Sequence, residues 1–503
     1  MIRTLCILAA GVMMTSACAN QKEQHSQKKP NILFVFADDL TFTALGNLEP
    51  NSLHTPHLNQ LMAEGTSFQK AYNMGSWTGA VCAASRAMMI SGRSVWETQA
   101  FKENWKKGED IDKTWPKLME KAGYETYMTG KWHVDIHPDK IFNHTAHIRG
   151  GMPGDKWQHG HMVQKFDSLA KAGQTDYSSL MPVGYNRPLS PEDHSWSPTD
   201  TTMGGFWEGG THWSEVLRED AIGFLDHASQ IDKPFFMYLA FNAVHDPRQS
   251  PGKYIDLYEV DEINLPESFM PVYPYKDAIG NGPALRDEAL APFPRTEYAI
   301  RTHLQEYYAL LSHMDAQIGE ILNKLEAIGE RENTYIIFTA DHGLAMGKHG
   351  LLGKQNMYEH SLAAPFIIAG PGIPEGQRMD KNIYLQDAMA TSLEIAGVER
   401  PEYLYFHSIL DLAKGKQEKV MDRVYGAYVS YQRMIKQDAF KLMVYPDAKQ
   451  VLLYDLENDP NELTNLADRP EYKGKVKELF TALQEEQARL GDQLTLIPMD
   501  YEL

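Results

Sequence analysis

Four continuous apolar runs constrain the fold of this chain more than any other feature. They are NILFVFADD (31–39), PFFMYLAFNAVHD (234–246), TYIIFTADHG (334–343) and APFIIAGPG (364–372). Runs without polar alternation are typical of strands that are buried on both faces, as in a parallel sheet. Three of the runs end in charged or histidine side chains. Because open α/β sheets bind ligands beyond the carboxyl ends of their strands, we expect one functional site there.

Helical patterns lie between the apolar runs, at 55–65, 114–124 and 303–329. Strands that alternate with helices predict an α/β fold with a large, mostly parallel sheet flanked by helices. Toward the C-terminus the pattern changes to short β-prone runs, split by turn residues and followed by an amphipathic helix. We therefore expect a main α/β domain over 31–418 and a smaller antiparallel sheet with a helix over 419–503.

The N-terminus has the pattern of an export signal. Arg3 is followed by the apolar run TLCILAAGVMM and then by small residues. Two cleavage sites compete, one before Cys18, which would then carry a lipid anchor, and one after Ala19. We favour the lipoprotein and predict a signal peptide over 1–18 and a polar tether over 19–30. The expected location is the periplasm or the outer membrane of a Gram-negative bacterium.

Composition narrows the possible partners. The 503 residues carry a formal net charge of −19, which argues against nonspecific binding of nucleic acid. The charge also disfavours anionic ligands at long range, so any anion site must build its own positive field. No run of 18 apolar residues is present, and we expect no membrane-spanning helix.

Cysteine usage singles out Cys82. The chain has three cysteines, and Cys6 and Cys18 both lie in the N-terminal segment. After export, Cys82 would be alone in an oxidising compartment, where structural cysteines are expected to pair. A lone cysteine is most often a small buried hydrophobe, so the neighbours of Cys82 must decide its role.

Acidic residues follow two of the apolar runs. Asp38 and Asp39 end the first run, and Asp341 and His342 end the third. Taken alone, adjacent carboxylates at a strand end can be a helix N-cap and a surface charge. Together these residues offer carboxylate oxygens and one histidine at the same edge of one sheet. This donor set predicts a site for a divalent cation such as Ca²⁺.

Cationic residues are expected at the same edge. Lys131 and His133 follow a strand-like segment, His245 ends its own strand, and Lys354 comes thirteen residues after Asp341. A lone lysine is usually a solvated surface residue. Two lysines, two histidines and an arginine after strands of one sheet instead predict a compact pocket for a tetrahedral dianion, such as sulfate or phosphate.

These motifs together resemble the type I sulfatases. CAASRAMMISG (82–92) is similar to their signature of Cys or Ser, any residue, Pro or Ala, Ser, Arg, four residues, Thr and Gly, with Ser91 in place of Thr. NILFVFADDL, GKWH, DHG and LYDLENDPNELTNLA (453–467) match further landmarks in the correct order, and the resemblance spans residues 30–467. The Asp-His pair also resembles the iduronate-2-sulfatase-like branch. The resemblance implies a bacterial carbohydrate sulfatase with an alkaline-phosphatase-like fold.

The resemblance also implies that Cys82 is converted to Cα-formylglycine (3-oxoalanine). One hydroxyl of the hydrated aldehyde would attack sulfur and release the alcohol, and the second hydroxyl would then expel sulfate from the covalent intermediate. Ala84 stands where the oxygen-dependent converting enzyme prefers proline. We therefore expect an anaerobic, radical-type sulfatase-maturating enzyme as a partner.

Roles for the other site residues follow from the same resemblance. One Ca²⁺ would be bound by Asp38, Asp39, Asp341, His342 and the modified residue 82. Arg86 would hold the modified side chain, and Lys131 and Lys354 would bind sulfate oxygens. His245 would protonate the leaving alcohol and His133 would accept a proton from the second hydroxyl, since both roles suit a group that titrates near neutral pH.

The expected substrate is a sulfated carbohydrate from glycosaminoglycan, mucin or algal glycans. The aperiodic segment 141–215, which we expect to be a long loop, offers aromatic and histidine side chains for sugar contacts, although such side chains also pack a loop of this kind. These are Trp157, His159, His161, Tyr185, Trp196, Trp207 and His212. Two alternatives stay open: a phosphate or phosphonate ester hydrolase of the same superfamily, and an unmatured surface protein that binds glycans.

Overall fold

The structure is a computed structural model. It describes residues 28–46, 51–153, 164–165, 167–169, 171–174 and 187–501. The predicted signal peptide, Cys18 and most of the predicted tether lie outside these residues, so those predictions stay predictions. Among the described residues, none of the helices combines the length and the apolar character that a bilayer span requires.

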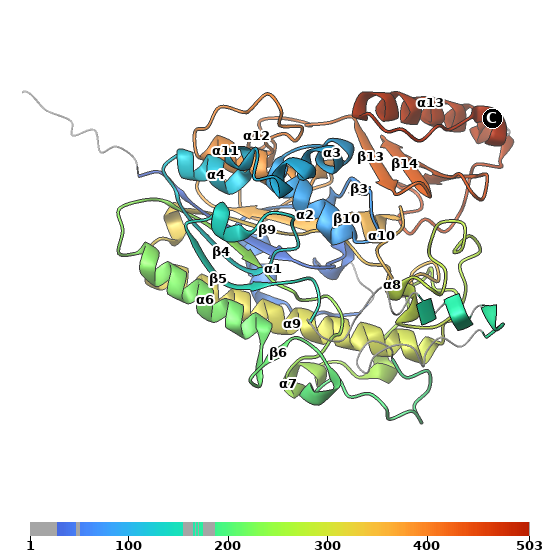
Figure 1. The fold of residues 1–503 in the computed structure, drawn as a ribbon, viewed down its shortest axis with the longest axis horizontal. Helices are drawn as coiled ribbons and strands as arrows, with labels where there is room; N and C mark the ends of the chain where they lie inside the picture. The colour runs from blue at the N-terminus through green and yellow to red at the C-terminus, as the bar shows by residue number, and fades with distance from the viewer. Residues whose placement is uncertain are drawn as a thin grey trace, which may run out of the picture.

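A nine-stranded sheet forms the centre of the larger part of the molecule (Figure 1). Its strands are β11 (Gln377–Met379), β2 (Thr66–Tyr72), β10 (Ala363–Ala369), β9 (Thr334–Ala340), β1 (Asn31–Ala37), β8 (Phe235–Ala240), β4 (Glu125–Lys131) and β5 (His144–Arg149), in this order, with β12 (Ile383–Tyr384) beside β2. Strands β9, β1, β8, β4 and β5 run parallel to one another. This confirms the predicted α/β fold with a large, mostly parallel sheet.

Helices cover both faces of this sheet, as Figure 1 shows. One face packs against α1 (Pro56–Glu64), α6 (Trp213–Ala228) and α9 (Glu297–Ala327), and the other packs against α2 (Val81–Ser91), α4 (Trp115–Lys121) and α11 (Asp387–Ile395). Alternate residues of β1 point to opposite faces, so Leu33 and Val35 join the first core while Phe34 and Phe36 join the second. Because both faces are buried, the strand needs the continuous apolar run that the sequence shows.

A smaller, five-stranded sheet lies toward the C-terminus. Its order is β16 (Gln450–Asp455), β15 (Phe440–Tyr445), β14 (Gln432–Gln437), β13 (Arg423–Tyr428) and β3 (Gly75–Ser76). Strands β13 to β16 are antiparallel, and α13 (Lys473–Leu490) packs against them, as predicted. Strand β3 pairs in parallel with β13 and lies just before α2 in the chain, so the small sheet is anchored next to Cys82. The domain boundary at residues 418 and 419 stays a prediction.

Two expectations about individual segments were wrong. The fourth apolar run forms β10, which is buried but antiparallel to both β9 and β2. An apolar run reports burial of both faces and carries no signal for strand direction. The segment 141–215 is not one loop, because it contributes the edge strand β5 and a short hairpin.

The aromatic residues of that segment are only partly described. Trp157, His159, His161 and Tyr185 lie outside the described residues. The indole of Trp196 donates to Glu306, that of Trp207 donates to Gln249, and His212 is buried. These three side chains make internal contacts.

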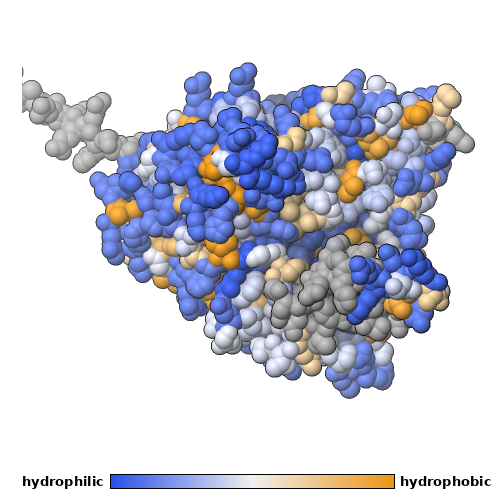
Figure 2. Space-filling model, in the orientation of Figure 1, coloured by the Kyte–Doolittle hydropathy of each residue, from blue (hydrophilic) through white to orange (hydrophobic). Residues whose placement is uncertain are grey.

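The remaining elements are short, apart from α3. They are η1 (Phe42–Ala44), α3 (Val95–Lys106), η2 (Ile111–Lys113), η3 (Pro138–Lys140), η5 (Thr201–Met203), β6 (Trp207–Glu208), β7 (Thr211–His212), α7 (Gly252–Ile255), η6 (Val260–Glu262), α8 (Arg286–Ala289), η7 (Arg331–Asn333), α10 (Glu359–Leu362), α12 (Leu410–Ala413), η8 (Pro470–Tyr472) and η9 (Pro498–Tyr501). The face of the molecule seen in Figure 2 is mostly hydrophilic, with apolar side chains in small groups.

Candidate active site

The carboxyl edge of the large sheet gathers the residues for which the sequence predicted catalytic or cation-binding roles. Four adjacent parallel strands end there: β9, β1, β8 and β4. Asp341 and His342 follow β9, Asp38 and Asp39 follow β1, His245 follows β8, Lys131 ends β4 and His133 follows it; Cys82 and Arg86 lie on α2, and Lys354 lies in the loop before α10. The structure therefore brings these residues together, while their chemical roles stay predictions.

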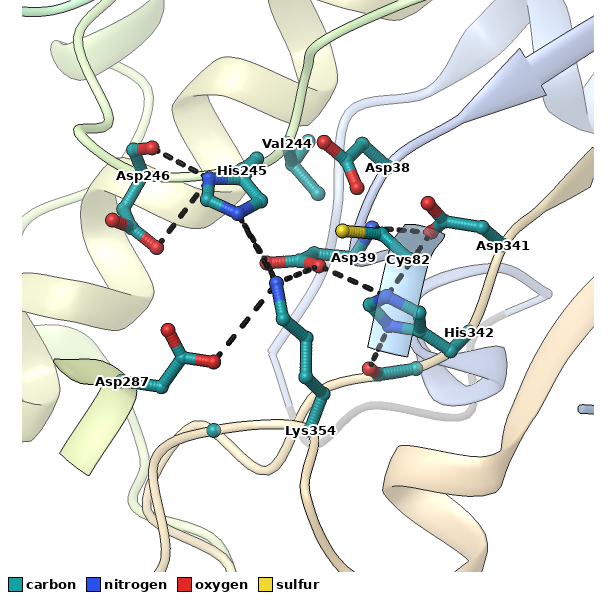
Figure 3. Close-up of polar contacts among 12 residues, drawn as sticks. Asp38, Asp39, Cys82, Val244, His245, Asp246, Asp287, Asp341, His342 and Lys354 are labelled. Carbon is teal, nitrogen blue, oxygen red and sulfur yellow. Dashed lines mark hydrogen bonds and ion pairs between the residues drawn. The ribbon is translucent and has the colours of Figure 1, made fainter. Parts of the chain in front are cut away.

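The carboxylates and His342 converge on one point. One ligand atom from each of Asp38, Asp39, Asp341 and His342 lies within 4.8 Å of those of the others, and all four residues are at most 1% exposed. Nδ1 of His342 lies 2.9 Å from the carbonyl oxygen of Gly343, to which it donates. Its Nε2 then faces the carboxylates, 3.5 Å from Oδ1 of both Asp39 and Asp341 (Figure 3).

The pKa shifts within this cluster reflect its crowded negative charge. Burial raises the pKa of Asp38 well above its ordinary value; Lys131 opposes the shift, and Asp341 and Asp39 add to it. Burial lowers the pKa of His342, but Asp341, a hydrogen bond with Cys82 and the charge of Asp39 outweigh it and raise that pKa to about 9. Oδ1 of Asp38 has no hydrogen-bond partner among the described residues. Buried carboxylates with an unpartnered oxygen and a convergent imidazole fit a divalent cation.

Arg86 connects the helix that carries Cys82 to the carboxylates. Its guanidinium is fully buried; Nε donates to Asp341 at 2.9 Å, and one terminal nitrogen donates to the backbone oxygen of Lys131 at 3.0 Å. Ser85, whose role the sequence did not reveal, donates to the backbone oxygen of Asp341 at 2.7 Å. Two consecutive side chains of α2, in its second turn, thus fix the N-terminal half of the helix against the end of β9.

Helix α2 ends at Gly92, which has a φ of 69° and donates its N–H to Met88 at 2.8 Å. A Cβ atom at Gly92 would lie 2.2 Å from the side chain of Leu404. Both the left-handed backbone and the close contact therefore require glycine at this helix end. The residues between the two ends, Met88 to Ile90, are fully buried.

Cys82 lies in the first turn of α2, at the wall of a cavity of about 360 Å³ that His133, His245 and Lys354 also line. Sγ of Cys82 is 3.3 Å from Nδ1 of His133. Burial raises the pKa of the thiol, but Lys131, His133 and Lys354 outweigh it, and the net shift is well below the ordinary value. The residue is therefore held where negative charge is stabilised.

Lys354 and His245 meet beside Asp39. Nζ of Lys354 donates to Oδ1 of Asp39 at 2.9 Å and lies 3.1 Å from Nε2 of His245 (Figure 3). An ammonium group only donates, so Nε2 of His245 accepts, and Nδ1 donates to the backbone oxygen of Asp246 at 2.6 Å. Burial, Lys354 and Lys131 lower the pKa of His245 well below its ordinary value, so its ring is neutral here.

Sequence reasoning missed several polar residues in contact with this site. Asp246 directly follows His245, and the strand-end argument that found its neighbour applies to it as well. Arg286 and Asp287 of α8 and Gln355 also line the cavity or contact its residues. Helix α8 has four residues and no periodic pattern, so no local sequence signal could have found Arg286 or Asp287.

A mostly parallel α/β sheet that carries a buried carboxylate–histidine cluster, a cysteine at a helix start and two lysines is the arrangement expected of a metal-dependent ester hydrolase. The model of the sulfatase family matches residues 30–398, and that of the C-terminal region of N-sulphoglucosamine sulphohydrolase matches residues 347–489. The chain belongs to the sulfatase family, whose members are sulfuric ester hydrolases.

Similar proteins support the same classification. N-acetylglucosamine-6-O-sulfatase of Bacteroides thetaiotaomicron is 26% identical over 97% of this chain and 91% of that protein. An arylsulfatase of Clostridium perfringens is 28% identical over 91% of this chain and 94% of that protein. The assignment to the iduronate-2-sulfatase-like branch stays a prediction.

Solved structures confirm the fold. BT4656 in complex with its substrate D-glucosamine-2-N,6-O-disulfate has a TM-score of 0.66 at 22% identity, covering 93% of this chain and 99% of that chain. The phosphonate monoester hydrolase SpPMH from Silicibacter pomeroyi has a TM-score of 0.69 at 20% identity, covering 92% and 96%. At these identities the likeness concerns the fold alone.

Proposed function

We propose that this protein hydrolyses O-sulfate esters of sulfated carbohydrates and releases inorganic sulfate. The observation that carries the proposal is the placement of Cys82. It lines a cavity next to a buried carboxylate–histidine cluster, 3.3 Å from His133 and beside Lys354. Nucleophilic attack on a sulfate ester requires a nucleophile, a bound cation and positive charge for the sulfate oxygens. This cavity brings together candidates for all three.

The proposed cofactor is one Ca²⁺ ion. Its ligands would be Asp38, Asp39, Asp341, His342 and the modified residue 82. The carboxylate oxygens suit Ca²⁺, whereas an imidazole nitrogen is an unusual ligand for it. When bound, the ion would lower the pKa of the attacking hydroxyl and neutralise sulfate oxygens.

Cys82 is proposed to be converted to formylglycine. Its hydrate would supply one hydroxyl that attacks sulfur and a second that expels sulfate. Ala84 favours a radical-type maturating enzyme. Mass spectrometry of the peptide that contains residue 82, from protein made in its native host, tests this step. An intact thiol in active enzyme from that host would refute it.

The surrounding side chains have separate proposed roles. Arg86 offsets the carboxylate charge and fixes α2, while Lys131 and Lys354 bind sulfate oxygens. His133, which already lies against Sγ of residue 82, is placed to accept a proton from that residue. His245 would protonate the leaving alcohol through Nε2, because its Nδ1 donates to the backbone. This role requires that Nε2, which accepts from Lys354 in the structure, takes up a proton before the alcohol leaves.

The substrate class rests on relatives as well as on the cavity. Similar proteins are named N-acetylglucosamine-6-O-sulfatase and ulvan-active sulfatase. A desulfation screen on defined sulfated mono- and disaccharides, read by sulfate release, tests the proposal. Faster turnover of a phosphonate monoester than of every sulfate ester would instead favour the phosphonate alternative. Binding of glycans without any turnover, by protein from the native host in which Cys82 is still a thiol, would favour the unmatured binding protein.

Export and a lipid anchor at Cys18 are part of the proposal. They rest on the sequence of the N-terminal segment alone. Fractionation of the native host and metabolic labelling with a fatty acid test them. A cytoplasmic protein would refute export, and an exported protein without the label would refute the anchor.

A further inference from the structure

Helix α8 places two charged residues between the segments that carry His245 and Lys354. Arg286 and Asp287 are consecutive, and both line the cavity beside Cys82. Asp287 is 6% exposed, and the side chain of Arg286 is 12% exposed. Neither residue follows a strand of the sheet. They reach the site from a segment separate from those that carry His245 and Lys354.

Arg286 contacts the segment that follows β8. One terminal nitrogen of its guanidinium bonds to the carboxylate of Asp246. Asp246 is 2% exposed, and its backbone oxygen accepts the hydrogen bond from Nδ1 of His245 at 2.6 Å. A buried carboxylate requires a cationic partner, and here that partner holds the residue that orients the His245 ring.

Asp287 contacts the loop that carries Lys354. Its Oδ1 pairs with the other terminal nitrogen of Arg286, while its Oδ2 accepts from Nε2 of Gln355 at 2.6 Å and lies 4.0 Å from Nζ of Lys354. Burial opposes ionisation, but Lys354 and Arg286 outweigh it and lower the pKa of Asp287 to about 2. Asp287 therefore keeps its negative charge beside Lys354.

The contacts close into a ring. Lys354 lies 3.1 Å from Nε2 of His245, His245 bonds to Asp246, Asp246 pairs with Arg286, and Arg286 pairs with Asp287, which faces Lys354. Figure 3 shows Asp246 and Asp287 on the same side of the site, each linked to one of the two predicted catalytic groups. The fork of an arginine suits this place because it can bond two carboxylates at fixed angles.

We propose that Arg286 and Asp287 are positioning residues of the sulfatase reaction. Arg286 holds His245 through Asp246, and Asp287 holds Lys354 in the loop before α10. The inference rests on the proposed function, since it takes His245 as the acid for the leaving group and Lys354 as a ligand of sulfate.

The two roles separate on esters with different leaving groups. The probes are 4-nitrophenyl sulfate, whose leaving group needs no protonation, and the sulfated monosaccharide that the wild-type enzyme desulfates fastest in the screen above. For Arg286→Gln we expect kcat on the sugar ester to fall by about 100-fold, with little change in KM, and a far smaller loss on the aryl ester. For Asp287→Asn we expect a similar loss in kcat/KM on both esters, because both carry the sulfate.

A double variant tests whether Arg286 acts through Asp246. If it does, Asp246→Asn combined with Arg286→Gln loses no more than the larger single variant. The matched control is Asp277→Asn, which removes an acid whose side chain is 74% exposed and paired with Lys276 at the surface. This control should change neither rate. A thermal unfolding midpoint above the assay temperature establishes that each variant is folded in the assay.

The outcomes are distinct. Three results would overturn the positioning role of Arg286. The first is an equal loss of kcat on both esters in Arg286→Gln, and the second is a rise in KM for the sugar ester with kcat unchanged. The third is a loss in the double variant equal to the product of the losses in the two single variants. A folded Asp287→Asn with wild-type rates would overturn that of Asp287. Matured wild-type enzyme that releases sulfate neither from 4-nitrophenyl sulfate nor from any sugar ester of the screen would instead defeat the proposed function itself.

Discussion

The protein buries two clusters of charged side chains, and the two are built differently. The catalytic cluster, at the carboxyl edge of the large sheet, consists of Asp38, Asp39, Asp341 and His342. The inter-sheet cluster, between the large and the small sheet, consists of Lys70 on β2, Glu359 on α10, Lys436 on β14, Lys441 on β15 and Glu462 after β16.

In the inter-sheet cluster the carboxylates have cationic partners. Glu359 lies 3.0 Å from Lys70 and 3.1 Å from Lys441, and it accepts from the hydroxyl of Tyr72 at 2.7 Å. Glu462 pairs with the same Lys441 and accepts the backbone N–H of Glu359 at 2.8 Å. The pairing joins strands of both sheets, so this cluster is suited to hold the two parts together.

The carboxylates of the catalytic cluster also have cationic partners, since Lys131 pairs with Asp38, Lys354 with Asp39 and Arg86 with Asp341. The ligand atoms of this cluster converge, and Oδ1 of Asp38 has no hydrogen-bond partner among the described residues. In the inter-sheet cluster the carboxylates alternate with lysines, which contributes to the fold, whereas ligand atoms of four residues that converge within 4.8 Å of one another leave a place for a cation. The comparison teaches that the convergence of ligand atoms, rather than burial or pairing, separates the structural cluster from the functional one.

The largest expected effect comes from the nucleophile beside the catalytic cluster. Cys82→Ala should lower kcat by about 10⁴-fold or more, because the covalent step is lost. Its unfolding midpoint should stay close to that of the wild type, since the change removes one sulfur atom at a cavity wall. Sulfate release and thermal denaturation measure the two effects. Activity retained by Cys82→Ala would refute the nucleophile assignment.

The inter-sheet cluster should respond in the opposite sense. Lys441→Met leaves two buried carboxylates short of a partner and should destabilise the protein by about 3–5 kcal/mol, while the folded enzyme keeps its kcat. Chemical denaturation measures the loss. The control Lys475→Met removes a lysine of an exposed pair with Glu478 and should cost less than about 0.5 kcal/mol. If Lys441→Met instead lost much of its kcat at unchanged stability, the inter-sheet cluster would be functional rather than structural.

Much of the catalytic cluster could be predicted from the sequence. Asp38, Asp39, Asp341 and His342 end apolar runs, and the carboxyl ends of parallel strands meet at one edge of a sheet. The fold class followed from the same runs, because a continuous apolar composition indicates a strand that is buried on both faces. The antiparallel direction of β10 could not be predicted this way.

The inter-sheet cluster could not be predicted. Its carboxylates and lysines come from segments that are far apart in the chain. The residues around Lys441 in the sequence do not indicate that this lysine pairs with a buried carboxylate. The same reason hid Arg286 and Asp287. Strand β3 was missed because two residues show no period, yet it joins the small sheet to the helix of Cys82.

Removal of the cation should lower the free energy of unfolding by a smaller amount and should separate the catalytic cluster from the inter-sheet cluster. A chelator should destabilise the matured wild-type protein by about 2.7 kcal/mol relative to Ca²⁺ at 100 times its Kd. Asp38→Asn should lose most of this difference, whereas Lys441→Met should keep it, since its change lies outside the catalytic cluster. Thermal denaturation with and without Ca²⁺ measures the shift. A full shift in Asp38→Asn would mean that the cation binds elsewhere.

The smallest expected effect, counted per pH unit, is a pH slope in the inter-sheet cluster. Burial raises the pKa of Glu462 to about 7; Lys441 opposes the shift and Glu359 adds to it. Between about pH 4.5, the ordinary value, and pH 7 the folded protein holds this proton more tightly than the unfolded chain does. The contribution of Glu462 to stability is therefore greatest below that range and is lost as the pH rises, by at most about 1.4 kcal/mol per pH unit.

Glu462→Gln should remove this dependence. Subtracting its unfolding free energy from that of the wild type, across the same pH range, isolates the slope from all other titrations. Glu478→Gln, at the exposed end of a surface pair, is the matched control and should run parallel to the wild type. If Glu462→Gln also runs parallel, then Glu462 stays ionised throughout. The inter-sheet cluster would then hold both carboxylates charged with Lys441 shared between them, and its pairing would be complete rather than one proton short.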